Sequence, residues 1–506
     1  MLAKVSSCAV VGIDALAVEV EVDVASGLPS FDIVGLPGAS VREARDRVRS
    51  AIKNSGFDFP MGRVTVNLAP AHVPKAGTLF DLPIAMGILA ASGQLPLPAR
   101  DSPVMVGELS LDGSVRAVWG VLCIAAAMGG SPRLLVLPRG NRAEVEAVAG
   151  VRAVPVATLR EAAELAKQGW PRAEITAGVG DPPAQSRDDP WKDVWGQETA
   201  KRALEISIAG GHHALLIGPP GAGKTLLARQ AARLAPPLSR DEVVEVSRIY
   251  SVAGLLSEDE PFLYQRPFRS PHHTVTIPAL LGGGAAPRPG EVSLAHRGVL
   301  FLDELGEFDR AVIDALREPL EEGVVTVSRV FGRCVFPARF TLIGALNPCP
   351  CGYLGDPERP CSCRPAEVHR YRRRLSGPIL DRIDLFIRVQ RPAAGEARLR
   401  GGQRSAPVRD RAAAIARARR LQRERFGREG RLNGEIPFDE IHVYCVLDRE
   451  GERLLRRAAA GWNLSPRSVH RVMRVARTIA DLEGDERIRA QHVAEALSYR
   501  QESQLA

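Results

Sequence analysis

Apolar and polar residues alternate differently in three successive segments of the chain. In the segment 1–170, β-like runs such as ALAVEVEVDV and RVTVNLAP alternate with stretches of helical spacing such as SVREARDRVRSAIKNSG. Residues 171–190 are rich in Pro, Gly and Asp, which predicts a linker. A second α/β segment follows at 191–392, and an Arg-rich segment of helical spacing occupies 393–506. The pattern predicts an α/β multidomain protein whose C-terminal domain is helical.

The composition excludes several classes of protein. The 506 residues exceed what one hydrophobic core organises, and 45% hydrophobic with 25% charged residues is typical of a globular protein. The apolar runs are shorter than the ~20 residues of a membrane-spanning helix, and the N-terminal residues predict a strand and not a signal peptide. We therefore expect a cytoplasmic protein with no membrane partner. The net charge of +8 is compatible with nucleic-acid binding but does not establish it.

The clearest motif lies in HALLIGPPGAGKTLLARQAARL, where a short apolar strand precedes a helical stretch. The motif matches the P-loop pattern G-x-x-x-x-G-K-[ST], with Lys224 placed to reach the β- and γ-phosphates and Thr225 to ligate Mg²⁺. The glycines allow backbone N–H groups to point at phosphate oxygens, and the following helix N-terminus favours negative charge. The sequence thus predicts binding of ATP and Mg²⁺ by Gly218, Pro219, Pro220, Gly221, Ala222, Gly223, Lys224, Thr225 and Leu226.

Two further apolar runs end in polar residues of the kind that an ATPase needs. The run in GVLFLDELGEF ends at Asp303 and Glu304. Asp303 would hold the Mg²⁺ ion, and Glu304 would polarise the attacking water as general base. The run in RFTLIGALN ends at Asn347, whose amide can hold that water or sense the γ-phosphate.

A loop of unusual composition, NPCPCGYLGDPERPCSC, begins at Asn347. It contains four of the eight cysteines of the chain, Cys349, Cys351, Cys361 and Cys363. Four thiolates suit tetrahedral Zn²⁺, and such a closed site would be structural. The C-x-C spacing is tighter than the usual C-x₂₋₄-C, so a redox-active pair or a loop without metal remain alternatives.

With these motifs the chain resembles the AAA+ ATPases, and more closely the magnesium-chelatase-like family with its ComM/YifB members. The resemblance extends over the whole chain, in FDIVGLPGASVREARDRVRSAIKNSG, VTVNLAPAHVPKAGTLFDLPIAMGILAASGQL, RPFRSPHHTVTIPALLGGG, LNPCPCGYLGD and RLSGPILDRIDL. It implies a P-loop core with a parallel sheet at 191–392, a helical lid of the magnesium-chelatase C-terminal type at 393–506, and a homo-hexameric ring that binds ATP between subunits.

The resemblance also assigns roles to polar residues outside the P-loop. It implies that Asn347 is sensor 1, that Arg467, at the start of an expected helix, is sensor 2, and that Arg382 in LDRID is the arginine finger acting on the next subunit. Arg374 lies close to Arg382 in the sequence and competes for the role of finger.

The first segment resembles the Lon-protease-like domain, which has a ribosomal-S5-like α/β fold. Lon peptidases use a Ser–Lys dyad. In register with the serine, this chain has KAGTLFDLPIA, from Lys75, which contains no serine, and in register with the lysine it has Leu122 or a neighbouring apolar residue. Thr78 lies nearby, but a hydroxyl group without a base is not an activated nucleophile. We therefore expect a non-proteolytic domain that positions DNA or stabilises the ring.

The resemblance to ComM-like proteins implies a hexameric helicase that drives branch migration of DNA during homologous recombination and natural transformation, with recombination proteins as further partners. The alternation in EEGVVTVSRVFGRCVFPARF predicts a β-hairpin around Gly332. In related ATPases such a hairpin lines the pore and grips nucleic acid. Arg329 and Arg333, near its tip, are candidates for sequence-independent phosphate contacts, and a solvated tip is the alternative.

The stretch RDRAAAIARARRLQRERFGREGR predicts a long helix in the C-terminal segment. Ile415, Ala418 and Leu421 fit one apolar stripe, which leaves arginines such as Arg419 and Arg425 outward. A charged face of this kind is usually solvated; contact with an adjacent subunit or with DNA are the alternatives.

Three other functions compete with that of an ATP-driven DNA motor. A magnesium-chelatase-type motor subunit that remodels a protein partner has the same core. An ATP-dependent protease is disfavoured because the dyad is missing. A scaffold that binds ATP without turnover is disfavoured because Lys224, Asp303 and Glu304 are all present.

Overall fold

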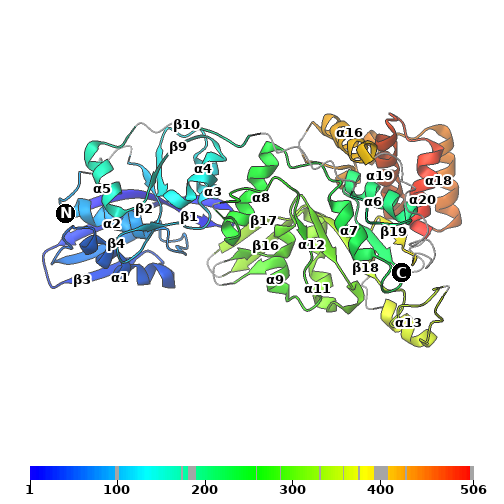
Figure 1. Ribbon diagram of the computed structural model, residues 1–506, viewed down its shortest axis with the longest axis horizontal. Coiled ribbons are helices and arrows are strands. Elements are labelled where there is room, and N and C mark those ends of the chain that lie inside the picture. Colours follow the sequence, from blue (N-terminus) through cyan, green and yellow to red (C-terminus); the bar gives the residue numbers. More distant parts are fainter. Residues whose placement is uncertain are drawn as a thin grey trace.

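The computed structural model describes residues 1–96, 102–171, 175–180, 190–257, 259–284, 287–329, 332–356, 358–373, 377–391, 408–427 and 430–501. It is elongated, with an N-terminal α/β unit, a central core around a parallel sheet and a C-terminal helical unit arranged along the long axis (Figure 1). This architecture confirms the predicted fold class. In the described part of the chain, no helix is both long and apolar enough to cross a bilayer.

The N-terminal unit contains an eight-stranded mixed sheet in the order β10-β9-β8-β5-β1-β2-β4-β3. Its strands are β1 (Leu2–Val11), β2 (Asp14–Ala25), β3 (Ser30–Val34), β4 (Arg63–Ala69), β5 (Val104–Met105), β8 (Leu134–Pro138), β9 (Ala149–Val156) and β10 (Ile175–Ala177), beside a separate pair β6 (Glu108–Leu109) and β7 (Val115–Arg116). Its helices are α1 (Ala39–Asn54), α2 (Asp81–Ala91), α3 (Val121–Met128), α4 (Arg142–Glu146) and α5 (Leu159–Gln168), with a short 3₁₀ turn η1 (Arg139–Asn141). Strand β10 lies within the expected linker, 171–190, so the sheet extends into that segment.

The alternation that predicted strands in the first segment reflects a sheet with one buried face. On β2 the side chains of Val18, Val20 and Val22 are buried, whereas Glu19 between them is exposed. Helix α2, which is buried along its whole length, packs against β1 and β2. Apart from Asp81, which pairs with Arg47, its sequence DLPIAMGILAA is apolar, as its buried position requires.

The core contains a five-stranded parallel sheet in the order β12-β15-β18-β11-β19. Its strands are β11 (Ala214–Ile217), β12 (Phe268–Arg269), β15 (Val299–Leu302), β18 (Thr341–Leu346) and β19 (Leu385–Arg388), and two hairpins are added by β13 (Gly282–Gly283) with β14 (Arg288–Pro289) and by β16 (Val324–Arg329) with β17 (Gly332–Pro337). Its helices are α6 (Glu198–Gly210), α7 (Lys224–Ala232), α8 (Arg240–Ala253), α9 (Ile277–Leu281), α10 (Glu291–Leu294), α11 (Arg310–Ala315), α12 (Arg317–Glu322), α13 (Pro365–Arg372) and α14 (Gly377–Leu380), with a 3₁₀ turn η2 (Leu305–Glu307).

Strands β11, β15 and β18 are buried at every position because helices cover both faces of the sheet, which is why they appear in the sequence as continuous apolar runs. Since all the strands run in the same direction, the sheet has two distinct edges. We call the edge where the strands end the carboxyl edge and the edge where they begin the amino edge. The six residues of β18 separate the two edges by roughly 20 Å.

The C-terminal unit consists of α16 (Val408–Phe426), η3 (Asn433–Glu435), α17 (Ile441–Tyr444), α18 (Arg449–Gly461), α19 (Pro466–Glu483) and α20 (Ala490–Gln501). Helices α16 and α19 pack against α6 of the core. A buried ionic network holds them together: Asp481 accepts hydrogen bonds from Arg425 at 2.5 and 2.8 Å, from Arg477 at 3.1 Å and from Asn433 at 2.8 Å.

Replacement of Asp481 by Ala is expected to destabilise the C-terminal unit by about 3–5 kcal/mol, because it leaves buried guanidinium groups without a counter-charge. The thermal unfolding midpoint of the purified chain measures the effect. Glu452→Ala is the control, since it removes an ion pair that is exposed on α18, where exposed pairs contribute little. Equal midpoints for the two variants would contradict the prediction.

The N-terminal unit and the core are joined by a buried interface between α3 and α8. Gly120 donates its backbone N–H to the carbonyl and hydroxyl oxygens of Ser251 at 3.3 and 3.1 Å, and the Ser251 hydroxyl donates to Glu144 at 2.6 Å. Leu122 and Cys123 are fully buried in an apolar cluster that continues into the core. The two units therefore share one hydrophobic core at this junction.

The β16–β17 hairpin also lies against the N-terminal unit. Gly12, in the turn between β1 and β2, is so close to β17 that a Cβ there would lie 3.5 Å from the carbonyl oxygen of Val335 and 3.6 Å from the Cβ of Cys334. Beside this contact, Arg248 on α8 donates to the Ile13 carbonyl oxygen at 2.6 Å. The long β1–β2 hairpin of the first unit thus reaches the hairpin of the core.

Candidate active site

The loop between β11 and α7 adopts the conformation that phosphate binding requires. Gly218 lies against the backbone of Val389, where any Cβ would overlap the Val389 carbonyl oxygen, and Gly223 has a φ of +85° at the N-cap of α7. Both positions therefore need glycine. The first N–H groups of α7 have no partner within the helix and open onto the carboxyl edge, where they can bind an anion.

Lys224 lies at the centre of this site. Its ammonium group donates to the carbonyl oxygens of Gly218 at 2.7 Å and Pro219 at 3.0 Å, and to the amide oxygen of Asn347 at 3.0 Å. Burial lowers the pKa of Lys224 to about 8, although the carboxylates of Asp303 and Glu304 oppose the shift. A bound triphosphate would add further negative charge and favour the charged ammonium group.

The expected magnesium ligands are in direct contact. The hydroxyl group of Thr225 donates to Asp303 at 2.6 Å, and the other carboxylate oxygen of Asp303 accepts the backbone N–H of Glu304 at 2.9 Å. A hydroxyl and a carboxylate at a phosphate-binding loop are the ligands that P-loop enzymes use for Mg²⁺. Thr225 and Asp303 are therefore the residues that would hold the ion.

Glu304 lies beside Asp303 with its side chain largely exposed toward the space above the carboxyl edge. Its backbone has a φ of +51°, which is uncommon outside glycine. This conformation changes the direction of the chain, and of the Glu304 side chain, directly after β15. Its carboxylate is 4.0 Å from Nδ1 of His273, a residue that the sequence reasoning did not identify. The ring of His273 also packs against His272 and Phe308. The signal was present in the His-His pair of RSPHHTVTIP, but only the fold places it opposite Glu304.

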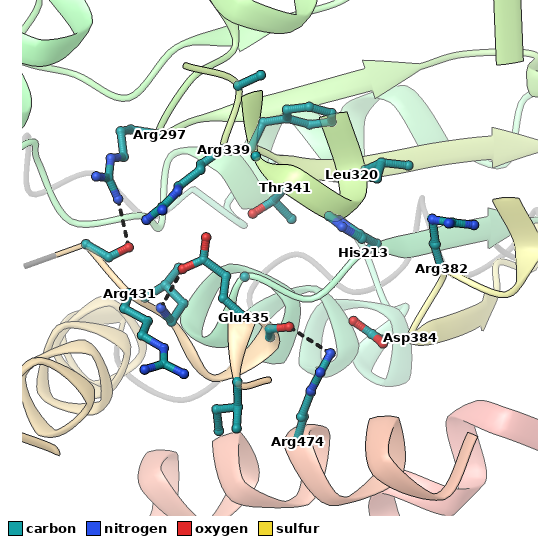
Figure 2. Close-up of a pocket in the computed structure, with 18 of the residues that line it drawn as sticks. His213, Arg297, Leu320, Arg339, Thr341, Arg382, Asp384, Arg431, Glu435 and Arg474 are labelled. Carbon is teal, nitrogen blue, oxygen red and sulfur yellow. Dashed lines mark hydrogen bonds between the residues drawn. The ribbon is translucent and has the colours of Figure 1, made fainter. Parts of the chain in front are cut away.

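A cavity of about 770 Å³ lies at the amino edge between the core sheet and the C-terminal helices (Figure 2). Side chains from the strand beginnings, such as His213, Thr341 and Asp384, form one wall, and Arg474 on α19 projects from the other. Ten arginines line the cavity: Arg266, Arg297, Arg339, Arg382, Arg419, Arg423, Arg431, Arg467, Arg471 and Arg474.

The two arginines expected to act on ATP, Arg382 and Arg467, both line this cavity. Arg382 is paired with Glu321, and burial together with the nearby cations Arg317, Arg471 and Arg467 lowers its pKa. Arg467 is exposed on the first turn of α19, as expected from the sequence. The competing Arg374 lies outside the described residues. Both arginines are therefore at the sheet edge opposite to Lys224 of the same chain.

Comparisons with known proteins found similarity along most of the chain. Residues 190–397 match the family model described as magnesium chelatase, subunit ChlI; residues 20–141 match subunit ChlI of Mg-chelatase; and residues 402–500 match the ChlI C-terminal model. Competence protein ComM of Haemophilus influenzae is 43% identical over 507 residues, which cover 99% of this chain and 97% of the relative. The protein YifB of Salmonella typhimurium is 43% identical over 502 residues, with the same coverage.

The chain belongs to the ComM/YifB family of magnesium-chelatase-like AAA+ proteins. The five-stranded parallel core with its P-loop is the AAA+ part of this ComM/YifB-family protein. Part of the chain is also similar to Lon protease 2 of Bacillus subtilis, which is 29% identical over 151 residues, or 29% of this chain and 27% of that protein.

In this ComM/YifB-family protein the four cysteines meet in space. The Sγ–Sγ distances are 3.4 Å for Cys349–Cys351 and 3.6 Å for both Cys349–Cys361 and Cys351–Cys361. When Cys363 is included, all four sulfur atoms lie within 4.8 Å of one another. Thiolates bound tetrahedrally to Zn²⁺ at about 2.3 Å would be ~3.8 Å apart. Although burial opposes the shift, backbone N–H groups of the loop lower the pKa of the Cys351 thiol to about 5. The donor set fits a closed metal site.

A second cluster of potential ligands, Glu483, Asp485 and His492, does not fit a metal ion. Nδ1 of His492 accepts the backbone N–H of Arg489 at 3.0 Å, so the neutral ring carries its proton on Nε2. Nε2 lies 3.1 Å from Glu483 and 3.4 Å from Asp485, to which it donates that proton. The cluster therefore ties the end of α19 to the start of α20.

The predicted hairpin is present as β16 and β17, which pair in antiparallel register from Val324↔Pro337 to Arg329↔Gly332. The side chain of Arg333 is exposed and donates to the Thr326 hydroxyl at 3.3 Å. The side chain of Arg329 and residues 330–331 lie outside the described residues. One of the two candidate DNA contacts is thus placed on an exposed strand end.

The Lon-like segment shows structural partners at its polar residues. Lys75 is almost fully buried and donates to the Pro70 carbonyl oxygen. Thr78 donates to Glu108 at 2.5 Å. Leu122, which with its apolar neighbours was expected in register with the lysine of Lon peptidases, is part of the buried junction with the core.

Proposed function

We propose that this protein is an ATP-hydrolysing, homo-hexameric DNA motor that drives branch migration in homologous recombination during natural transformation. Membership of the AAA+ family supports hydrolysis of ATP with Mg²⁺, and the 43% identity with competence protein ComM supports the pathway. The Cys loop carries a structural Zn²⁺ ion in this proposal, and the N-terminal unit positions DNA or stabilises the ring and has no peptidase activity.

One observation supports the proposal most: the residues expected to bind ATP and the arginines expected to complete the site lie at opposite edges of the same sheet. Lys224, Thr225, Asp303 and their neighbours face the carboxyl edge, whereas Arg382 and Arg467 face the amino edge. In a ring with head-to-tail contacts, the arginines of one subunit meet the carboxyl edge of the next. Binding of ATP between subunits then completes the site, and an arginine supplied by a neighbour stabilises the transition-state charge.

The reaction divides between residues of the two edges. At the carboxyl edge, Lys224 neutralises the β- and γ-phosphates, and Glu304 takes a proton from the attacking water, which Asn347 orients. Thr225 and Asp303 would hold a Mg²⁺ ion, which would supply further positive charge next to the phosphates. The arginines of the adjacent subunit are needed only as charge develops, so hydrolysis depends on assembly.

The test uses synthetic three- and four-strand DNA junctions incubated with the purified protein, with and without ATP. DNA is expected to stimulate ATP turnover, and ATP is expected to drive strand exchange; Lys224→Ala provides the baseline. If DNA does not change the rate of ATP hydrolysis and the junctions stay intact, the proposal of a DNA motor is rejected. The second candidate, a magnesium-chelatase-type motor that remodels a protein partner, would then be favoured, since the three family models name a subunit of magnesium chelatase.

Replacement of Arg333 by Ala should weaken DNA binding independently of sequence and lower the slope of log affinity against log salt by about 1, because one phosphate contact is lost. Fluorescence anisotropy of a labelled junction across a salt series measures both quantities. Arg456→Ala, which removes another exposed arginine, on α18, should leave the slope unchanged. If both variants bind like the wild type, the hairpin arginine is a solvated surface residue.

A further inference from the structure

The Cys loop, residues 347–356 and 358–363, contacts the P-loop at two points. At its beginning, the amide oxygen of Asn347 accepts a hydrogen bond from the ammonium group of Lys224 at 3.0 Å. Five residues later, Gly352 lies against the ring of Pro220, so close that a Cβ on Gly352 would lie 2.5 Å from the Pro220 Cδ. Cys349 and Cys351 stand between these two contacts. Whatever holds the two sulfur atoms therefore also holds one wall of the phosphate site.

A third contact strengthens this wall. Arg391, which follows β19, donates to the carbonyl oxygen of Pro220 at 3.0 Å and places its guanidinium group 6.0 Å from the ring of Tyr353. Arg359 contacts the same ring, since its guanidinium group lies 5.4 Å from the ring centre and donates to the phenol oxygen at 3.1 Å. Tyr353 thus links the Cys loop to the residue that holds the P-loop backbone.

The second pair of cysteines leads to the other side of the ATP site. Cys361 and Cys363 directly precede α13, whose Tyr371 is buried against η2. A Cβ on Gly306 in η2 would lie 2.6 Å from the Tyr371 hydroxyl oxygen. Gly306 follows Glu304 by two residues. The four sulfur atoms therefore join a segment packed on the P-loop to a helix packed on the segment behind the general base.

The Cys loop contains too few apolar residues to form a hydrophobic core that would hold these contacts in place. Its sequence is dominated by Pro, Gly and charged residues, and of the four cysteines only Cys349 is buried. A segment that cannot bury a core needs another source of order, and metal ligation by four thiolates supplies it.

We propose that Zn²⁺ bound by the four cysteines makes the Cys loop a brace for the ATP site, so that nucleotide affinity depends on this metal. The brace holds Asn347 and Gly352 against the P-loop and holds α13 against η2. The inference rests on the proposed ATPase function and adds to it a device outside the P-loop that positions the P-loop.

Two glycines of the loop provide a matched test. Gly352 and Gly355 have φ values of +83° and +77°, so alanine causes similar backbone strain at both. Only at Gly352 does the new Cβ meet Pro220, since no heavy atom lies within 4 Å of the corresponding position at Gly355. Gly352→Ala is expected to raise the Kd for a fluorescent ATP analogue about tenfold, and Gly355→Ala by no more than about twofold.

Metal content and reversibility complete the test. Protein purified without chelator should carry one Zn²⁺ per chain, as should both alanine variants. Stripping Zn²⁺ from the wild-type chain should weaken nucleotide binding about tenfold, and Zn²⁺, but not additional Mg²⁺, should restore it. Equal affinity of the two glycine variants, unchanged affinity after stripping, or four free thiols without metal would overturn the brace. A wild-type, zinc-loaded chain that binds no ATP would instead overturn the proposed ATPase function.

Discussion

Replacement of Glu304 by Gln is expected to slow ATP hydrolysis by about 10²- to 10⁴-fold while ATP still binds, because the amide cannot accept a proton from the attacking water. Glu304 is exposed at the carboxyl edge next to Asp303, and neither Lys224 nor Thr225 depends on it for a hydrogen bond. Phosphate release measures hydrolysis, and a fluorescent nucleotide measures binding.

Two variants serve as controls for this experiment. Glu307→Gln makes the same chemical change three residues further on, in η2, and should hydrolyse ATP normally. Lys224→Ala should lose both binding and hydrolysis, since the P-loop then lacks its cation. Normal hydrolysis by Glu304→Gln would show that another group activates the water, and His273, 4.0 Å from the Glu304 carboxylate, would be the next candidate.

Replacement of Arg382 by Ala is expected to lower hydrolysis by about 10³-fold, yet mixing this variant with Lys224→Ala should restore part of the activity. The reason is the separation of the two edges: an Arg382→Ala subunit keeps its carboxyl edge intact, and a Lys224→Ala neighbour supplies an intact amino edge. In a random mixture about a quarter of the interfaces are then complete. The rate of phosphate release in the mixture, compared with each variant alone, measures this recovery.

The control is a mixture of Lys224→Ala and Glu304→Gln. Both changes lie on the carboxyl edge, so every interface keeps one defective ATP site and no activity should return. Arg467→Ala mixed with Lys224→Ala tests sensor 2 in the same way. If mixed rings form and Arg382→Ala gains nothing, Arg382 does not complete the site of a neighbour.

The residues of the carboxyl edge could be predicted from the sequence because local patterns determine them. A buried parallel strand is a continuous apolar run, and the polar residue that follows it must lie at the strand's end. Three such runs end at the P-loop, at Asp303 and at Asn347, and parallel pairing brings these ends together. The same logic located the β16–β17 hairpin, whose tip lies next to Gly332.

The environment of the arginines could not be predicted, because it depends on packing between distant parts of the chain. Arg419 and Arg425 were expected to face outward, yet Arg419 donates to the Ile208 carbonyl oxygen at 2.6 Å and Arg425 to the buried Asp481. Leu421, expected in the apolar stripe, is exposed. Helical periodicity describes one face of an isolated helix, whereas α16 is contacted by both α6 and α19.

The contacts of the Cys loop were hidden for the same reason. Spacing suggested a metal site, but nothing local indicates that Gly352 touches Pro220, which lies more than a hundred residues earlier in the chain. The amino-edge cavity likewise forms only when α19 docks beside β19, where Arg471 reaches the Ile383 carbonyl oxygen at 3.3 Å. Sequence motifs identify the functional side chains, whereas tertiary packing determines at which edge of the core sheet each side chain lies.

The contact between Gly12 and the β16–β17 hairpin has a mechanical consequence. β17 lies against the β1–β2 turn, and the two units share a buried junction. Any movement of the hairpin relative to the core would therefore have to slide it over Gly12 or carry the N-terminal unit with it. A close-packed contact resists sliding. In the proposed DNA motor, the N-terminal unit would therefore move together with the hairpin, so the stroke of the hairpin would depend on both units.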